Sequence, residues 1–168
     1  SVAAAMPFYG VYDFTNRHRD ANPNLEELLA TRVIKTRLAD DRATWDLASP
    51  MSHVRPDAPP FFLLHGTNDT VVPVEQGRNF ARMLGEASRQ PVVFAELPRA
   101  QHAFDTLPSV RAHHTVRAVE RFLAVVRSRR RHDSGLPAVR VAPGEPVATA
   151  ARTGASSTAS VPGGRQAM

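Results

Sequence analysis

The hydrophobic positions along the chain change their period several times, and each change predicts a new element. Short apolar runs that end at a turn residue predict buried strands, at residues 1–10, 59–66 and 91–98. Apolar residues spaced three or four apart predict helices, over residues 24–38, 72–88 and 109–127. Strands that alternate with helices are typical of a parallel sheet, so the pattern predicts an α/β fold with three parallel strands covered by helices.

The first predicted helix has one apolar face, formed by Leu25, Leu28, Leu29 and Val33. We expect this face to be buried, with Pro23 in the first turn and Asn22 or Asn24 as the cap. Residues 39–60 show no sustained period and are rich in Asp, Ser and Pro, which predicts a long irregular connection with one short helical turn.

The charge of the chain is distributed unevenly. The formal net charge is +5, and the whole excess lies in residues 127–168, because the positive and negative charges before them balance. A Pro-, Gly- and Ala-rich basic segment without periodicity is typical of a solvated extension, so we expect residues 131–168 to be a disordered tail and expect no nucleic-acid partner. No apolar stretch is long enough to predict a transmembrane segment, and with no cysteine in the chain no thiolate chemistry is available.

Two polar residues follow two of the predicted strands at the carboxyl end, where ligands bind in parallel α/β sheets. Asp69 comes after the strand at 59–66, and His102 after the strand at 91–98. A carboxylate that accepts the imidazole N–H leaves the other ring nitrogen free to take a proton from a nucleophile. The spacing therefore predicts an acid and base pair, although Asp69 taken alone could be only a turn residue. Asp105, three residues after His102, is a candidate cap for the last helix.

The stretches around this pair resemble the C-terminal part of an α/β-hydrolase, most closely the hormone-sensitive-lipase-like esterases and lipases. The resemblance rests on four segments spread over about residues 2–126: "AAMPFYGVYDFT", "ASPMSHVRPDAPPFFLLHG", "HGTNDTVVPVEQ" and "RAQHAFD". It implies that Asp69 is the acid and His102 the base of a catalytic triad acting on carboxylic esters. It also implies that residues 1–130 are the C-terminal portion of the hydrolase domain and that 14–58 are a cap-like connecting region.

The nucleophile of this family, the Ser of G-x-S-x-G, is missing from the chain. Only Gly154 has a Ser two positions later, and Thr158 then replaces the second glycine. The oxyanion motif of the family is absent as well, and both parts precede the present segment in the family's order. The resemblance therefore implies a partial hydrolase fold that lacks its N-terminal half, with nucleophile and oxyanion hole upstream of residue 1. We expect the chain alone to be inactive.

Other interpretations stay open. The nucleophile decides between an esterase and another α/β-hydrolase chemistry, such as that of a peptidase, a dienelactone hydrolase or a dehalogenase. A non-catalytic binding module with a basic tail is a further alternative. In the cap-like region, a substrate pocket or ordinary core is equally consistent with Trp45, Leu47 and Met51. We expect no cofactor and no metal, since His53, His113 and His114 lack the spacing of a helical zinc site, and the sequence leaves the localisation undetermined.

Overall fold

The computed structural model describes residues 2–133 of the chain. The elements of this part, in chain order, are α1 (Pro23–Leu28), the π-helical turn η1 (Leu29–Val33), α2 (Arg42–Ala48), the 3-10 turn η2 (Pro50–His53), β1 (Phe61–Gly66), α3 (Val74–Ala87), β2 (Val92–Leu97) and α4 (Val110–Asp133). From residue 59 onward, strands and helices alternate as the sequence predicts.

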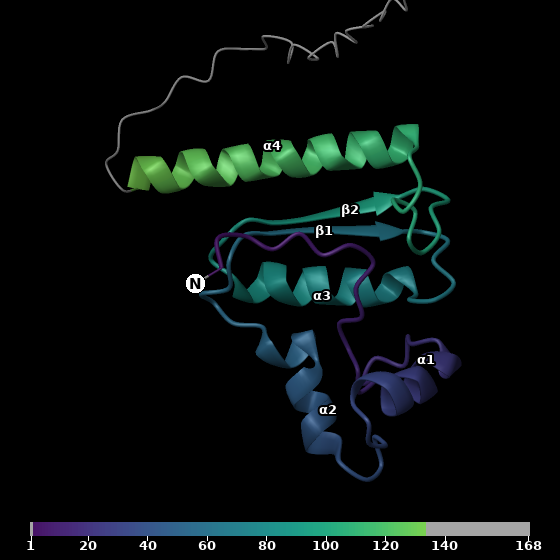
Figure 1. The fold of residues 1–168 in the computed structure, drawn as a ribbon. Coiled ribbons are helices and arrows are strands. Elements are labelled where there is room, and N and C mark those ends of the chain that lie inside the picture. The colour runs from purple at the N-terminus through teal and green to yellow at the C-terminus, as the bar shows by residue number, and fades with distance from the viewer. Residues whose placement is uncertain (1, 134–168) are drawn as a thin grey trace, which may run out of the picture. The chain divides into compact units, whose positions relative to one another are not determined.

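The sheet consists of two parallel strands joined by a helical crossover (Figure 1). Phe61 of β1 pairs with Val92 of β2, and the register continues without interruption to Gly66 and Leu97. Parallel neighbours require such a crossover, which α3 provides, and it brings the carboxyl ends of both strands to one edge. The two loops that carry Asp69 and His102 therefore begin side by side.

The first predicted strand does not form as a regular strand, so the prediction of three strands is corrected to two. Its segment still runs parallel to β1, but only as two isolated bridges, Ala5 to Phe61 and Phe8 to Leu64. The physical reason lies in the chain itself. Pro7 has no amide hydrogen to donate to a ladder, and Tyr9 has a φ of 39°, which is outside the extended region.

Two helices cover the two faces of the sheet (Figure 1). The ring of Phe61 packs 5.8 Å from that of Phe80 on α3, whereas the ring of the next residue, Phe62, packs 5.4 Å from that of Phe122 on α4. Successive side chains of a strand point to opposite faces. Because both faces are covered, β1 is apolar at consecutive positions instead of alternating.

A buried glutamine ties the segment after the first bridges to α3. Gln76 is fully buried, and its Oε1 accepts hydrogen bonds from the amides of Tyr12 (3.1 Å) and Asp13 (2.9 Å). Its side-chain nitrogen donates to Asp20, which also accepts from Asn79. These bonds satisfy backbone groups that no sheet ladder reaches, so they fix the start of the cap-like region against α3.

Residues 14–58, which the sequence analysis predicts to be a cap-like region, contain a small core in which Leu25, Leu29 and Trp45 are buried together. Asn22 caps α1, with Pro23 in the first turn, as expected. The expectation of one continuous apolar face was wrong, because Leu28 and Val33 are 51% and 54% exposed. The amide of Ile34 donates to the carbonyl of Leu29, five residues earlier, so the helix widens over Leu29–Val33 and turns Val33 away from the core. Leu28 precedes this turn, and the widening does not account for its exposure.

The last helix is longer than predicted. The prediction ends this helix at residue 127, whereas α4 continues to Asp133 and passes the predicted domain boundary at 130. Residues 131–133 are therefore helical instead of disordered, and the rest of the predicted tail, 134–168, lies outside the described residues. Among residues 2–133, no helix combines the length and the apolar character that a membrane span needs.

Candidate active site

Asp69 lies in the turn after β1, with its side chain fully buried. One carboxylate oxygen, Oδ1, accepts hydrogen bonds from the amides of Val71 (2.9 Å) and Val72 (2.8 Å). A carboxylate that binds the amides two and three residues later forms an Asx-type turn, which fixes its direction. The local sequence therefore aims the second oxygen, Oδ2, away from its own turn.

The loops after β1 and β2 are joined through their backbones. The amides of Thr67 and Asn68 donate to the carbonyls of Leu97 and Ala100, each at 3.0 Å. The approach is so close that a Cβ on Gly66 would lie 2.3 Å from the carbonyl oxygen of Ala100. Only glycine fits where backbones come this near, so Gly66 sets the distance between the two loops.

His102 meets Asp69 across these loops. Its Nδ1 lies 2.8 Å from Oδ2 of Asp69, and 28% of its side chain is exposed. Because a carboxylate only accepts, Nδ1 carries the hydrogen and Nε2 holds a free lone pair. No other residue among 2–133 forms a hydrogen bond with Nε2. The structure thus brings together the two residues that the sequence singles out, in the geometry of an oriented general base.

A second histidine lies beside the same carboxylate. The fully buried His65 places Nε2 at 2.9 Å from the carbonyl of Val72 and at 3.4 Å from Oδ2 of Asp69. Nε2 must therefore donate, and Nδ1 is a buried acceptor with no partner in the described part of the chain. Burial lowers the pKa of His65, although the bond to Val72 and the charge of Asp69 act in the opposite direction. His65 is therefore a neutral, buried residue that supports the turn carrying Asp69.

Tyr9 lies against His102, although no sequence pattern pointed to it, and two residues of the His102 loop, Phe104 and Asp105, contact Tyr9 in turn. The Tyr9 ring lies 4.4 Å from the His102 ring, and the Phe104 ring packs edge-on against Tyr9 at 5.7 Å. Asp105 accepts a hydrogen bond from the Tyr9 hydroxyl at 2.8 Å. Asp105 is therefore not the cap of the last helix, a place that Ser109 takes, because its hydroxyl accepts from the amide of Ala112.

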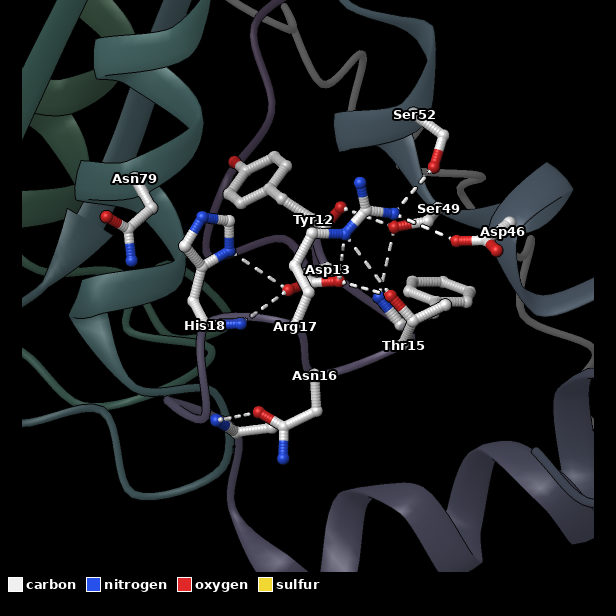
Figure 2. Close-up of polar contacts among 12 residues, drawn as sticks. Tyr12, Asp13, Thr15, Asn16, Arg17, His18, Asp46, Ser49, Ser52 and Asn79 are labelled. Atoms are coloured by element: carbon white, nitrogen blue, oxygen red, sulfur yellow. Dashed lines mark hydrogen bonds and ion pairs between the residues drawn. The ribbon is translucent and has the colours of Figure 1, made fainter. Parts of the chain in front are cut away.

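Figure 2 shows a second Asp–His pair, in the loop after the first bridges. The carboxylate of Asp13, which is fully buried, lies 3.1 Å from Nδ1 of His18 and 3.3 Å from Nε of Arg17. Burial raises the pKa of Asp13, but hydrogen bonds from Thr15 and His18 and the charge of Arg17 outweigh it and lower the pKa overall. Arg17 and Thr15 also bind the Asp13 carboxylate, so it has several partners besides His18. We interpret this cluster as one that holds the loop in place.

Of the two interpretations left open for Trp45, Leu47 and Met51 in the cap-like region, the structure favours ordinary core and surface, because the three side chains lie in different surroundings. Trp45 is fully buried in the core of that region, Met51 is buried in the main core, and Leu47 is 72% exposed. Among residues 2–133, no group of three or more His, Cys, Asp or Glu side chains is placed to hold a metal ion. His102, whose Nδ1 is oriented by Asp69, offers proton transfer at Nε2.

Comparison with known proteins assigns the family. The family model BD-FAE matches residues 1–84, half of the 168-residue chain. The chain belongs to this family of α/β-hydrolase esterases. The segment matched by the family model contains the first bridges, the cap-like region, β1 and the turn with Asp69, and the match ends within α3.

Three similar proteins with esterase names illustrate the relationship of this BD-FAE chain. It is 53% identical to the "Probable carboxylic ester hydrolase LipM" of Mycobacterium tuberculosis, over 74% of this chain and 29% of LipM. It is 44% identical to the esterase LipQ of the same organism, over 77% of this chain and 31% of LipQ. An esterase of Thermogutta terrifontis with propionate bound superposes with a TM-score of 0.59, at 25% identity, over 75% of this chain and 43% of that one. The chain thus spans less than a third of the length of LipM and of LipQ.

Proposed function

We propose that Asp69 and His102 are the acid and base of a Ser-His-Asp triad in a carboxylic ester hydrolase. The observation that carries the proposal is the 2.8 Å hydrogen bond from Nδ1 of His102 to the buried Oδ2 of Asp69. Kinship with ester hydrolases such as LipM and LipQ supports the choice of ester as the substrate class.

The two residues divide the work of proton transfer. The bond to Asp69 fixes the His102 tautomer, so that Nε2 accepts the proton of a serine hydroxyl while the hydroxyl oxygen attacks the ester carbonyl. Nε2 then returns the proton to the leaving alcohol, and an acyl-enzyme remains. Water, deprotonated by the same nitrogen, releases the acid. Asp69 stabilises the imidazolium at each step and holds the ring through the two amides that orient its own carboxylate.

The remaining catalytic groups belong, in this proposal, to a part of the protein outside these 168 residues. The 168-residue sequence contains no G-x-S-x-G, and the match leaves most of the length of LipM and LipQ uncovered. An ester hydrolase also needs donors for the oxyanion, since even one missing donor costs about 10²–10³ in rate. The 168-residue chain alone should therefore turn over no ester.

The test compares variants of the full-length hydrolase on p-nitrophenyl acetate and butyrate. We expect Asp69→Asn to lower kcat about 10⁴-fold and His102→Gln by at least as much, with ester binding largely kept. His113→Gln is the matched control, because His113 is an exposed residue of α4.

Two outcomes would contradict the proposal. Wild-type turnover by His102→Gln would remove the proposed base. Turnover by the 168-residue chain that is lost on His102→Gln would place a nucleophile within it. A p-nitroanilide assayed in parallel tests the peptidase alternative, for which hydrolysis of the anilide would exceed that of the esters.

A further inference from the structure

Tyr9 connects two residues of the His102 loop, His102 and Asp105, to β1. Its ring lies 4.4 Å from the imidazole ring of His102, with an angle of 57° between the two planes. Its hydroxyl donates at 2.8 Å to Oδ1 of Asp105, three residues further along the same loop. One side chain thus contacts the proposed base directly and holds the segment that follows it.

A hydrogen bond to β1 holds the backbone of Tyr9 in a conformation that is unfavourable for a residue other than glycine. Its amide donates to the carbonyl of Leu64 on β1 at 2.7 Å, and its φ of 39° lies in the left-handed region that favours glycine. A non-glycine residue holds such a conformation only when its surroundings determine it, and sites of this kind cluster where function demands a fixed geometry. In Tyr9 the conformation directs the ring toward His102.

We propose that Tyr9 is a positioning residue for His102; this inference rests on the proposed function. The Tyr9 ring limits the rotation of the imidazole about its bond to Asp69. Its centroid is also within the roughly 6 Å over which an aromatic ring attracts a cation, so it favours the imidazolium that forms during the reaction. The hydrogen bond from the Tyr9 hydroxyl to Asp105 holds residues 102–105 in a fixed position relative to β1, to which the Tyr9 amide is bonded.

The electrostatics around Tyr9 suit this role. Burial raises the pKa of Tyr9, and the hydrogen bond to Asp105, the charge of Asp105 and the charge of Asp69 raise it further. The phenol therefore stays protonated over the pH range of an esterase assay and remains a donor to Asp105. The charges of Asp105 and Asp69 disfavour a Tyr9 phenolate. Because a phenol must lose its proton to attack, we exclude Tyr9 as a nucleophile over the pH range of an esterase assay.

The experiment uses the full-length hydrolase with Tyr9→Phe, Tyr9→Leu and the control Tyr12→Phe. Tyr12 stacks on Phe80 in the main core and does not contact His102. With p-nitrophenyl acetate, we expect Tyr9→Leu to lower kcat about tenfold and Tyr9→Phe about threefold, each with KM within about twofold of wild type. Tyr12→Phe should keep both constants.

A second measurement does not depend on turnover. In NMR spectra of histidine-labelled protein, the His102 ring protons should move in Tyr9→Leu, which loses the ring current of the tyrosine, and stay near wild type in Tyr9→Phe. Unchanged kcat and unchanged His102 signals in Tyr9→Leu would overturn the inference. If Tyr9→Leu does not fold, Tyr9→Phe decides by its kcat, and wild-type kcat in that variant would also overturn it.

His102→Gln separates this inference from the proposed function. If His102→Gln keeps activity, the proposed function fails. If His102→Gln is inactive and Tyr9→Leu matches wild type, only the role of Tyr9 fails. In the double variant, Tyr9→Leu should cause no further loss beyond that of His102→Gln, because a positioning residue has no effect once the group it positions is gone.

Discussion

Nε2 of His65 lies 3.4 Å from Oδ2 of Asp69, the same oxygen to which Nδ1 of His102 donates. The carboxylate therefore lies between two histidines with different surroundings. His65 is fully buried and bonded to the carbonyl of Val72, while His102 is partly exposed. The exposed ring is suited to exchange protons with a substrate, and the buried ring to hold the turn.

His65→Leu should destabilise the fold. Leucine fills a similar volume but has no donor, so the carbonyl of Val72 would stay buried without a partner. We expect the free energy of unfolding to fall by about 1–3 kcal/mol, measured by urea denaturation. His113→Leu, at an exposed position of α4, is the control and should change it by less than about 0.5 kcal/mol. Equal stability of His65→Leu and wild type would contradict the support role of His65.

Stability should also depend on pH through His65. Burial holds the pKa of His65 below its ordinary value of 6.5, so the unfolded chain binds a proton that the folded chain resists. The stabilisation is complete above pH 6.5 and is lost as the pH falls below it. Thermal unfolding between about pH 7.5 and 5.5 should show a falling midpoint, with a shallower slope in His65→Leu. Equal slopes of the midpoint against pH in wild type and His65→Leu would exclude His65 as the origin of the pH dependence.

Asp13 should cause a further loss of folding stability at a pH lower than the one at which His65 acts. The pKa of Asp13 lies below the ordinary 3.8, so the stabilisation is present above that value and is lost as the pH falls through the folded-state pKa. Asp13→Asn removes the charge that faces Arg17 and His18 in a fully buried place. Because Arg17 is partly exposed and also bonds Asp46 and Ser52, we expect a loss of about 1–3 kcal/mol at neutral pH by urea denaturation. Asp57→Asn, at an exposed ion pair with Arg55, should cost less than about 1 kcal/mol.

Two glycines should respond oppositely to alanine. In Gly66→Ala the new methyl group would lie 2.3 Å from the carbonyl oxygen of Ala100, a backbone atom that cannot move without separating the two loops. In Gly85→Ala on α3 the methyl group meets nothing within 4 Å. We expect Gly85→Ala to stabilise by about 0.5–1 kcal/mol and Gly66→Ala to destabilise by more than that. Differential scanning calorimetry of both variants tests the contrast, and a stable Gly66→Ala would contradict the close approach.

Tyr12→Phe should leave stability unchanged or raise it slightly. The Tyr12 hydroxyl is buried, and in the described residues no group forms a hydrogen bond of good geometry with it, although the backbone of Gly10 lies near it. Burial dominates and raises the pKa of Tyr12. The substitution removes a desolvated polar group and keeps the stack on Phe80 at 4.4 Å. A drop of more than about 1 kcal/mol in urea denaturation would reveal a partner for this hydroxyl.

The sequence predicted well wherever a local pattern carries the information. The prolines and glycine around β1 mark its limits, and the helical period predicts a helix over residues 72–88, close to the observed α3 (Val74–Ala87). It failed where a local feature breaks the period. Pro7 reduces the first strand to bridges, and the widened turn at Leu29–Val33 exposes Val33 of the predicted apolar face.

The sequence by itself determined the α/β order and singled out Asp69 and His102, because strand ends, turn residues and residue types are local properties of the chain. Only the tertiary structure decided that these two side chains meet, that His65 lies under the carboxylate, and that Tyr9 lies against the imidazole. The two contacts of His102 join segments far apart in sequence, whereas His65 and Asp69 are four residues apart and meet through the turn after β1. The contacts depend on the crossover of α3, on the register of β1 with β2 and on the close backbone approach at Gly66. None of these features produces a periodic pattern in the sequence, so the sequence alone could not predict them.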